Sequence, residues 1–174
     1  MSSNYPATSA SQYVLAALIS SDKPFSSAQN IKLTPIYLLG WFLIMFSAVL
    51  RLSSYRTLGR YFTFELGIQK GHKLVTTGPY AYVRHPSYIG LPCASLGHAL
   101  CHLTPGSWVW ECTELTEGTL GMVLGLLWVV VSAASLSAFL VRIKKEDEML
   151  RKEFGKEWEE WAKRVRWKVI PWLF

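Results

Sequence analysis

Three long runs of uncharged, mostly apolar residues mark the chain, and the charged residues gather between them. The runs cover residues 33–50, 87–110 and 118–141 and contain eighteen, twenty-four and twenty-four residues. A helix needs about 20 apolar residues to cross the hydrocarbon core of a bilayer. The pattern therefore predicts membrane-spanning helices over 33–50, 87–104 and 118–141.

A fourth, weaker span is expected over residues 5–21. This stretch carries no charge but is rich in serine, and its apolar centre is short. A weak helix and a disordered tail both fit it, whereas a cleaved signal peptide fits less well, because no Lys or Arg precedes the apolar centre. The expected fold class is an all-α integral membrane protein, a small bundle of about four transmembrane helices in a single domain over residues 1–174.

The placement of basic residues predicts the orientation of these spans. Sixteen of the eighteen Lys and Arg residues fall in the segments 51–84 and 142–168. The loop over 111–117 has three Glu and no basic residue. Because Lys and Arg are retained on the cytoplasmic side of a membrane, both basic segments and the C-terminus are expected in the cytosol.

Topology also explains the net charge of +6, so the basic composition does not require a nucleic-acid partner. The three cysteines form no C-x-x-C pair. Neither a disulfide framework nor a metal site is therefore indicated.

The segment after residue 142 predicts an amphipathic helix that lies on the membrane or over a pocket. Gly155 interrupts this segment and is expected to loosen or kink the helix. The apolar positions recur every three or four residues, at Leu150, Phe154, Trp158, Trp161 and Val165.

Candidate chemistry is concentrated in two clusters that flank the last two strong spans. In the first, Arg84 and His85 precede Pro86, which suits the first turn of a helix. The free N–H groups of that turn favour an anionic or hydroxyl ligand. Tyr and Arg at a membrane boundary also serve as plain interfacial anchors, so this cluster alone leaves both interpretations open.

The second cluster follows the strongest span. Arg142 and Glu146 are four residues apart and so share a helix face. The same spacing also fits an exposed ion pair that contributes little. Asp147, about 100° further around the same helix, is expected to matter much less than Glu146 to a ligand. Because both clusters are expected on the same side of the membrane, a pocket between them is plausible.

Several motifs in a fixed order give a more specific indication. They are T-L-G at 57–59, H-K-L-V-T-T at 72–77, G-P-Y-A-Y-V-R-H-P-S-Y-I-G at 78–90, the segment R-I-K-K-E-D-E-M-L-R-K-E-F-G-K-E-W-E-E-W at 142–161, and R-V-R-W-K-V-I-P at 164–171. Over about residues 57–172 the chain resembles isoprenylcysteine carboxyl methyltransferases. The resemblance implies a small helical membrane bundle whose cofactor lies under a C-terminal helix at the cytosolic face.

The resemblance also implies S-adenosyl-L-methionine as cofactor, and the prenylated (farnesyl or geranylgeranyl) C-terminal cysteine of proteins as substrate. It implies an endoplasmic reticulum location with the site facing the cytosol. Arg142 and Arg84 are the implied catalytic residues, and Arg142 faces the substrate. The implied cofactor-binding residues are Glu65, His72, Lys73, Leu74, Val75, Tyr80, His85, Pro86, Ser87, Tyr88 and Glu146.

Three residues depart from the family pattern. Glu65 stands where some relatives have an amide, and Trp158 and Trp161 stand where Tyr is common. The first substitution adds a charge to a cofactor contact. The two tryptophans keep an aromatic wall but remove two hydroxyls.

The chemistry of the candidate residues agrees with this interpretation. Methyl transfer from a sulfonium to a carboxylate needs positioning more than a strong base. Arg142 suits a bidentate pair with an acceptor carboxylate, and Glu146 suits hydroxyl or amino donors of the cofactor. Tyr80 and Tyr88 offer aromatic faces to a cation. A prenyl chain would enter sideways from the lipid.

Three alternatives remain open from the sequence. The same fold could methylate a phospholipid amine or another small lipophilic acceptor. Sterol reductases that use NADPH have a related R-H-P-containing region, although the R-x-x-x-E-D and F-G-x-E-W patterns favour a methyltransferase. In a non-catalytic membrane scaffold, both clusters would be anchors.

Overall fold

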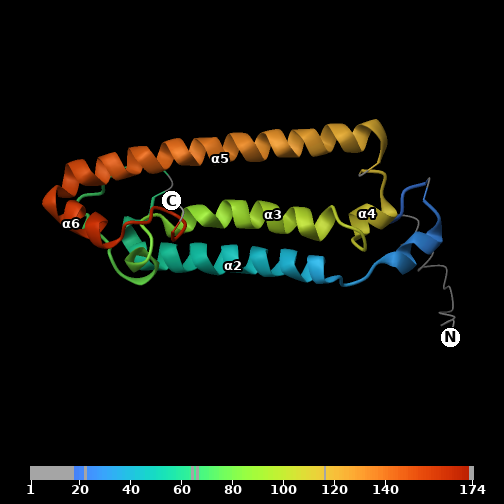
Figure 1. Cartoon of the computed structure of the whole chain (residues 1–174), viewed down its shortest axis with the longest axis horizontal. Helices are drawn as coiled ribbons and strands as arrows, with labels where there is room; N and C mark the ends of the chain where they lie inside the picture. Colours follow the sequence, from blue (N-terminus) through green and yellow to red (C-terminus); the bar gives the residue numbers. More distant parts are fainter. Residues whose placement is uncertain (1–17, 22, 64, 66, 116, 173–174) are drawn as a thin grey trace. The chain divides into compact units, whose positions relative to one another are not determined.

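The structure is a computed structural model, and it describes residues 18–21, 23–63, 65, 67–115 and 117–172 (Figure 1). Within these residues every regular element is a helix. The chain divides into two compact units. The first comprises the described residues of Met1–Trp41 and His98–Val129, and the second comprises those of Phe42–Gly97 and Val130–Phe174.

Helix α2 (Pro35–Leu58) begins and ends with residues suited to those positions. Thr34 precedes it, and its hydroxyl accepts a hydrogen bond from the Tyr37 backbone N–H at 3.1 Å, which satisfies one of the free amides of the first turn. Pro35 occupies the first helical position, where its missing N–H costs nothing. At the other end Gly59 has a positive φ of 53°, the conformation that commonly ends a helix.

Helix α3 (Gly90–His102) follows the short 3-10 turn η4 (Pro86–Ile89) and approaches α2 closely at its first residue. The Ser47 hydroxyl donates to the Gly90 carbonyl at 2.6 Å. A Cβ at Gly90 would lie 2.6 Å from Cγ of Arg51, so a larger residue there would collide with the Arg51 side chain. This glycine therefore allows α2 to place Arg51 beside the start of α3.

Helix α5 (Gly118–Phe154) is the longest element. Its 37 residues extend about 55 Å, whereas the hydrocarbon core of a bilayer is about 30 Å thick. The uncharged part comes first, so the charged residues after Val141 continue the same helix past the apolar span. The second cluster of candidate residues is thus on the extension of a membrane-length helix.

Among the described residues, two segments are long and apolar enough to cross a membrane, Pro35–Tyr61 and Gly118–Phe154. In the most apolar stretch of each segment, the buried share of the residues is 11% and 0%, respectively. A core helix of a soluble protein would bury such a face, whereas these apolar side chains lie on the outside. The burial pattern indicates an integral membrane protein.

The four expected spans compare unevenly with these helices. The spans over 33–50 and 118–141 correspond to α2 and α5, and both helices continue several residues further. The span over 87–104 corresponds to η4 and α3, where the α-helical part has 13 residues. The weak span over 5–21 lies outside the described residues, apart from residues 18–21.

A sharp turn separates α5 from helix α6 (Lys156–Arg164), as Figure 1 shows. Gly155 has φ 51° and ψ −117°, a conformation that residues with a side chain rarely adopt. The kink expected at Gly155 is therefore a complete helix break. Because of this break, apolar residues of the stripe in α5 pack against apolar residues of the stripe in α6.

The hydrophobic core of the second unit combines residues of the amphipathic stripe with Tyr80. Tyr80, Trp158, Trp161 and Val165 are buried together. Trp161 donates its indole N–H to the Tyr80 carbonyl at 3.2 Å, which fixes the 3-10 turn η3 (Gly78–Ala81) against α6. The core is extended by Leu58, Leu74, Val75, Leu150, Phe154 and Ala162.

The first unit contains the 3-10 helix η1 (Phe25–Asn30) and the short helix α4 (Trp108–Cys112). The Ser20 hydroxyl donates to Glu114 at 2.9 Å, and Lys23 forms an ion pair with Glu117. The acidic loop over 111–117 is thus tied to residues that precede α2.

Candidate active site

A cavity of about 200 Å³ lies in the second unit and is partly open to the outside. It combines aromatic walls with cationic and anionic side chains, which is typical of a site for a polar organic ligand. Its lining comprises Arg51, Tyr55, Leu58, Tyr61, Phe62, Thr63, Glu65, Gly67, His72, Leu74, Val75, Tyr80, Arg84, Ser87, Tyr88, Leu91, Phe139, Arg142, Glu146, Met149, Leu150 and Trp161.

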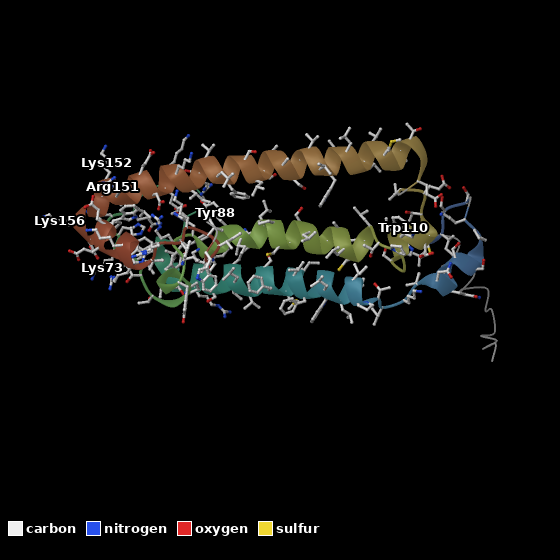
Figure 2. The ribbon with its side chains drawn as sticks, viewed as in Figure 1. Lys73, Tyr88, Trp110, Arg151, Lys152 and Lys156 are labelled. Atoms are coloured by element: carbon white, nitrogen blue, oxygen red, sulfur yellow. The ribbon has the colours of Figure 1, made fainter. Side chains whose placement is uncertain are left out.

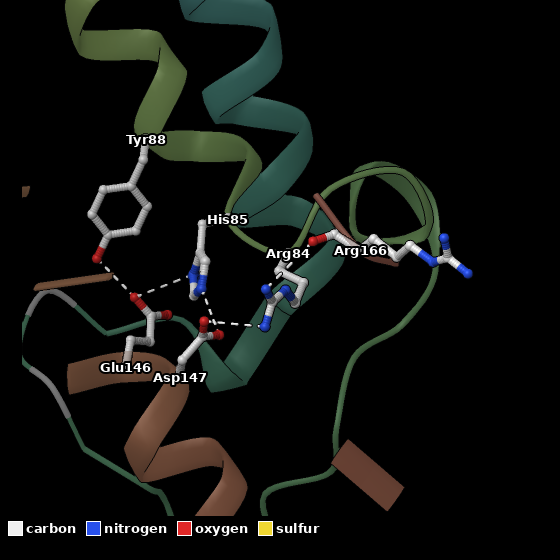
Figure 3. Close-up of polar contacts among 6 residues, drawn as sticks. All are labelled: Arg84, His85, Tyr88, Glu146, Asp147 and Arg166. Atoms are coloured by element: carbon white, nitrogen blue, oxygen red, sulfur yellow. Dashed lines mark hydrogen bonds and ion pairs between the residues drawn. The ribbon is translucent and has the colours of Figure 1, made fainter. Parts of the chain in front are cut away.

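A buried ion pair lies beside this cavity (Figure 3). Arg84 donates from Nη1 to Asp147 Oδ2 at 3.1 Å, and His85 Nε2 lies 2.9 Å from Asp147 Oδ1. Asp147 is 8% exposed and His85 is 2% exposed. A buried carboxylate is costly unless charged and hydrogen-bonding partners compensate for it, and here two residues do so.

Glu146 occupies the cavity side of the same helical turn. The Tyr88 hydroxyl donates to its Oε2 atom at 2.7 Å, and His85 Nδ1 lies 3.7 Å from the same oxygen. The Tyr88 ring packs edge-on against His85 and against Phe139. The start of α3 and the charged part of α5 are therefore joined by one network of polar and aromatic contacts.

The segment after α6 completes this network through its backbone. Arg84 N–H donates to the Trp167 carbonyl at 3.0 Å, and His85 N–H donates to the Lys168 carbonyl at 2.7 Å. Arg84 Nη2 also reaches the Arg166 carbonyl at 3.5 Å. We call residues 166–168 the carbonyl strap, because their carbonyls hold the Arg84–His85 backbone in place.

His72 contributes a stacked ring to another wall of the cavity. It stacks on Tyr61 with centroids 4.6 Å apart and meets Phe154 edge-on at 5.7 Å. Burial lowers the pKa of His72, and the nearby Glu153 carboxylate opposes this shift in part. Nδ1 of His72 is buried without a hydrogen-bond partner among the described residues. An unpaired buried nitrogen at a cavity wall suits a ligand atom.

Tyr80 presents a hydroxyl that stays protonated. Burial raises its pKa, and the nearby Glu146 carboxylate raises it further. A protonated phenol remains able to donate a hydrogen bond to a ligand. The Tyr80 ring belongs both to the hydrophobic core and to the cavity wall.

The structure places most of the residues implied by the family resemblance around this one cavity. Three of them do not line it. His85 and Pro86 are buried behind the wall, and Lys73 is exposed at the end of the unit where Lys152 and Lys156 also lie (Figure 2). Those that line it are Glu65, His72, Leu74, Val75, Tyr80, Arg84, Ser87, Tyr88, Arg142 and Glu146.

Sequence reasoning missed residues of the cavity wall, among them Arg51 and Tyr55. Arg51 lines the cavity from α2, and it donates from Nε and Nη2 to the Tyr55 hydroxyl at 3.1 and 2.8 Å. The first charge after an uncharged span was a signal that could have drawn attention to Arg51. Asp147 was expected to matter less than Glu146 to a ligand, and it does not line the cavity. Its burial between Arg84 and His85 could not be read from helical spacing.

The arrangement can bind a ligand that carries both charges and an aromatic part. Arg142 and Glu146 place a cation and an anion one helical turn apart on the cavity wall. Tyr55, Tyr80 and Tyr88 supply aromatic surface. Among the described residues, no group of three or more His, Cys, Asp or Glu side chains is arranged to hold a metal ion.

Comparison with known proteins identifies the class to which this fold and site belong. Residues 38–152 match the isoprenylcysteine carboxyl methyltransferase (ICMT) family. This match covers nearly all of α2, the Arg84–His85 segment, α3 and nearly all of α5. The chain belongs to that family.

Among individual relatives, the protein-S-isoprenylcysteine O-methyltransferase of Dictyostelium discoideum is 30% identical over 144 residues, which are 82% of this chain and 52% of the relative. Protein-S-isoprenylcysteine O-methyltransferase B of Arabidopsis thaliana is 31% identical over 128 residues, 72% of this chain and 55% of the relative. The chain thus spans about half the length of these methyltransferases.

A more distant similarity connects the chain to a reductase. The Delta(14)-sterol reductase ERG24B of Gibberella zeae is 26% identical over 121 residues, which are 61% of this chain and 25% of the relative. A similarity to sterol reductases, as expected from the sequence, is therefore present. Its lower identity and coverage do not favour a reductase.

Proposed function

We propose that this protein transfers a methyl group from S-adenosyl-L-methionine to the C-terminal carboxylate of a prenylated cysteine. The observation that carries the proposal is the shared cavity, whose wall presents Arg142 and Glu146 one helical turn apart beside Tyr80 and Tyr88. Family membership and the names of the relatives support the reaction class.

The residues of the cavity fit this cofactor. Glu146 accepts hydrogen bonds and can take hydroxyl or amino donors. Nδ1 of His72, which is buried and has no hydrogen-bond partner in the described part of the chain, offers a further polar contact. Tyr80 and Tyr88 present π faces, which attract a sulfonium cation. The family resemblance carries over further cofactor contacts, and we propose them for Glu65, Leu74, Val75 and Ser87, which line the cavity. Lys73, His85 and Pro86, which the resemblance also assigns to the cofactor, lie next to lining residues in the chain.

When bound, S-adenosyl-L-methionine would supply an electrophilic methyl group. Its transfer to a carboxylate oxygen would break the C–S bond, leave the electron pair on sulfur, and give a methyl ester and a neutral thioether. Arg142 would hold the acceptor carboxylate through paired N–H donors. Arg84, fixed by Asp147 and the carbonyl strap, would keep positive charge at the other wall. The protein's contribution is orientation, which alone can lower such a barrier substantially.

The membrane setting suits this substrate. The exposed apolar faces of α2 and α5 would contact lipid, and a prenyl chain would reach the site from the bilayer. We propose four spans, with both basic segments and the amphipathic α6 at the cytosolic face of the endoplasmic reticulum.

The test is transfer of a labelled methyl group by the purified protein in liposomes. A farnesylated cysteine analogue should be methylated, and an unprenylated analogue should not. A phosphatidylethanolamine lipid serves as the second acceptor. Transfer to the amine lipid alone would refute carboxyl methylation and leave the methyltransferase fold unaffected. Binding of NADPH without binding of S-adenosyl-L-methionine would favour a reductase.

A further inference from the structure

Asp147 is the centre of the buried polar cluster, and the proposed reaction uses it only to fix Arg84. Its side chain does not line the cavity. It accepts from Arg84 through Oδ2 and lies 2.9 Å from His85 Nε2 through Oδ1. An ionised carboxylate can only accept hydrogen bonds. The hydrogen between Asp147 and His85 must therefore be carried by His85 Nε2.

This constraint determines what the other ring nitrogen of His85 can do. A neutral imidazole has one donor nitrogen and one acceptor nitrogen. With the hydrogen on Nε2, Nδ1 carries a lone pair and cannot donate to Glu146. The 3.7 Å between Nδ1 and Glu146 Oε2 agrees, because it exceeds hydrogen-bond length. Glu146 is instead held by the Tyr88 hydroxyl.

We propose that Asp147 is the positioning residue of this site: by fixing His85 as the Nε2–H tautomer, it keeps the ring from donating to Glu146 and preserves that carboxylate as an acceptor for hydroxyl or amino groups of the cofactor. Only the identity of the ligand rests on the proposed function. Asp147 acts through His85, because neither side chain lines the cavity.

The tautomer can be measured without any ligand. Nitrogen-15 NMR of the ring nitrogens distinguishes the two neutral tautomers, and the chain has 4 histidines. The His85→Gln variant identifies the His85 signals by their loss. In the wild-type protein we expect the hydrogen on Nε2 of His85. A wild-type spectrum with Nδ1–H, or with both nitrogens protonated, overturns the proposal whether or not the protein is a methyltransferase.

The variant Asp147→Asn should reverse the tautomer while it keeps the shape of the side chain. Arg84 has only donors, so the amide oxygen must face Arg84 and the amide N–H must face His85 Nε2. Nε2 then accepts, and the hydrogen moves to Nδ1, where it points to Glu146 Oε2. An amide in place of a carboxylate that orients a histidine has this effect in general.

We expect the dissociation constant of S-adenosylhomocysteine, the product form of the cofactor, to rise about tenfold in Asp147→Asn. Glu148→Gln is the matched control, because it makes the same acid-to-amide change at the next residue, which is exposed. In Glu148→Gln the dissociation constant of S-adenosylhomocysteine should change less than about twofold. Weakened binding without a reversed tautomer would contradict the proposal.

A second background tests whether Asp147 acts through His85. In His85→Gln the glutamine amide can pair with either an acid or an amide at position 147, and no ring nitrogen faces Glu146. Adding Asp147→Asn to this background should therefore change binding less than about twofold. An equal loss of affinity in both backgrounds would show that Asp147 acts independently of His85, and the proposal would fail.

Discussion

Individual residues of α5 differ sharply in their surroundings although they are adjacent in sequence. Glu146 faces the cavity, Asp147 is buried behind it, and Glu148 is exposed. We expect Glu146→Ala to weaken S-adenosylhomocysteine binding by about 1.5–3 kcal/mol, the cost of a lost charge-assisted hydrogen bond. Calorimetric titration measures this change. Glu148→Ala should have almost no effect, and equal losses for both variants would indicate a solvated charge run instead of a site.

Arg142 allows charge to be separated from geometry at one position. Lysine keeps the positive charge but lacks the planar fork that pairs with two carboxylate oxygens. In Arg142→Lys we expect turnover of the farnesylated analogue to fall more than about tenfold, with cofactor affinity nearly unchanged. Steady-state rates and a separate binding titration distinguish the two effects. Unchanged turnover would mean that Arg142 does not hold the acceptor.

The lowered pKa of His72 predicts a dependence of stability on pH. The folded state favours the neutral ring, so below about pH 6.5 the unfolded state binds a proton more readily than the folded state does. Stability contributed by neutral His72 is thus present above that pH and is lost as the pH falls through the lower folded-state value.

Thermal unfolding between about pH 7.5 and pH 5 measures this loss. The His72→Gln variant has no titrating ring at position 72, so its unfolding midpoint should fall less over the same pH interval than that of the wild-type protein. Identical pH dependence in both proteins would exclude His72 as its source.

How far the sequence predicts a residue's role depends on whether the contact is local. Arg142 and Glu146 could be paired from helical spacing alone, because i and i+4 share a face. The burial of Asp147 depends on Arg84 and His85, which are more than 60 residues away in the chain. Spacing says where a side chain points but not what lies there, so it could not reveal the ion pair that Asp147 forms with Arg84 behind the cavity.

Among the elements, the break between α5 and α6 has the clearest energetic consequence. Gly155 has a backbone conformation that a Cβ makes unfavourable, at a typical cost of about 1–3 kcal/mol. We expect Gly155→Ala to lower the thermal unfolding midpoint by about 2–12 °C. Gly125→Ala is the control, because Gly125 lies within α5 and a Cβ there meets no atom within 4 Å. That variant should be neutral or slightly stabilising.

The elements were predicted well where one apolar run makes one helix. The runs over 33–50 and 118–141 became α2 and α5, since an apolar helix surrounded by lipid needs no partner to satisfy its backbone. The amphipathic stripe after residue 142 was also a helical feature, but its two ends belong to different helices. Hydrophobic spacing of three and four residues continues across Gly155, so periodicity alone could not locate the turn.

At the scale of the whole molecule, the placement of basic residues predicts orientation across the membrane. In a variant whose three native cysteines are replaced, a new cysteine at Lys163 in α6 should react with an impermeant reagent from the cytosolic side of sealed vesicles. A cysteine at Glu114 should react only after the vesicles are opened. Reaction of the Glu114 position from the cytosolic side would reverse the proposed topology.

The carbonyl strap also imposes an order on synthesis. His85 N–H pairs with the carbonyl of Lys168, and 168 − 85 gives a separation of 83 residues. At about 5–20 residues per second, roughly 4–17 s pass between translation of the two. Until residue 147 has been translated, the Arg84 guanidinium has neither its Asp147 carboxylate nor its Arg166 carbonyl, and burying it unpaired would be costly. The nascent chain must therefore keep this arginine hydrated at the membrane surface while its apolar helices insert, and the site matures only after the ribosome has passed residue 168.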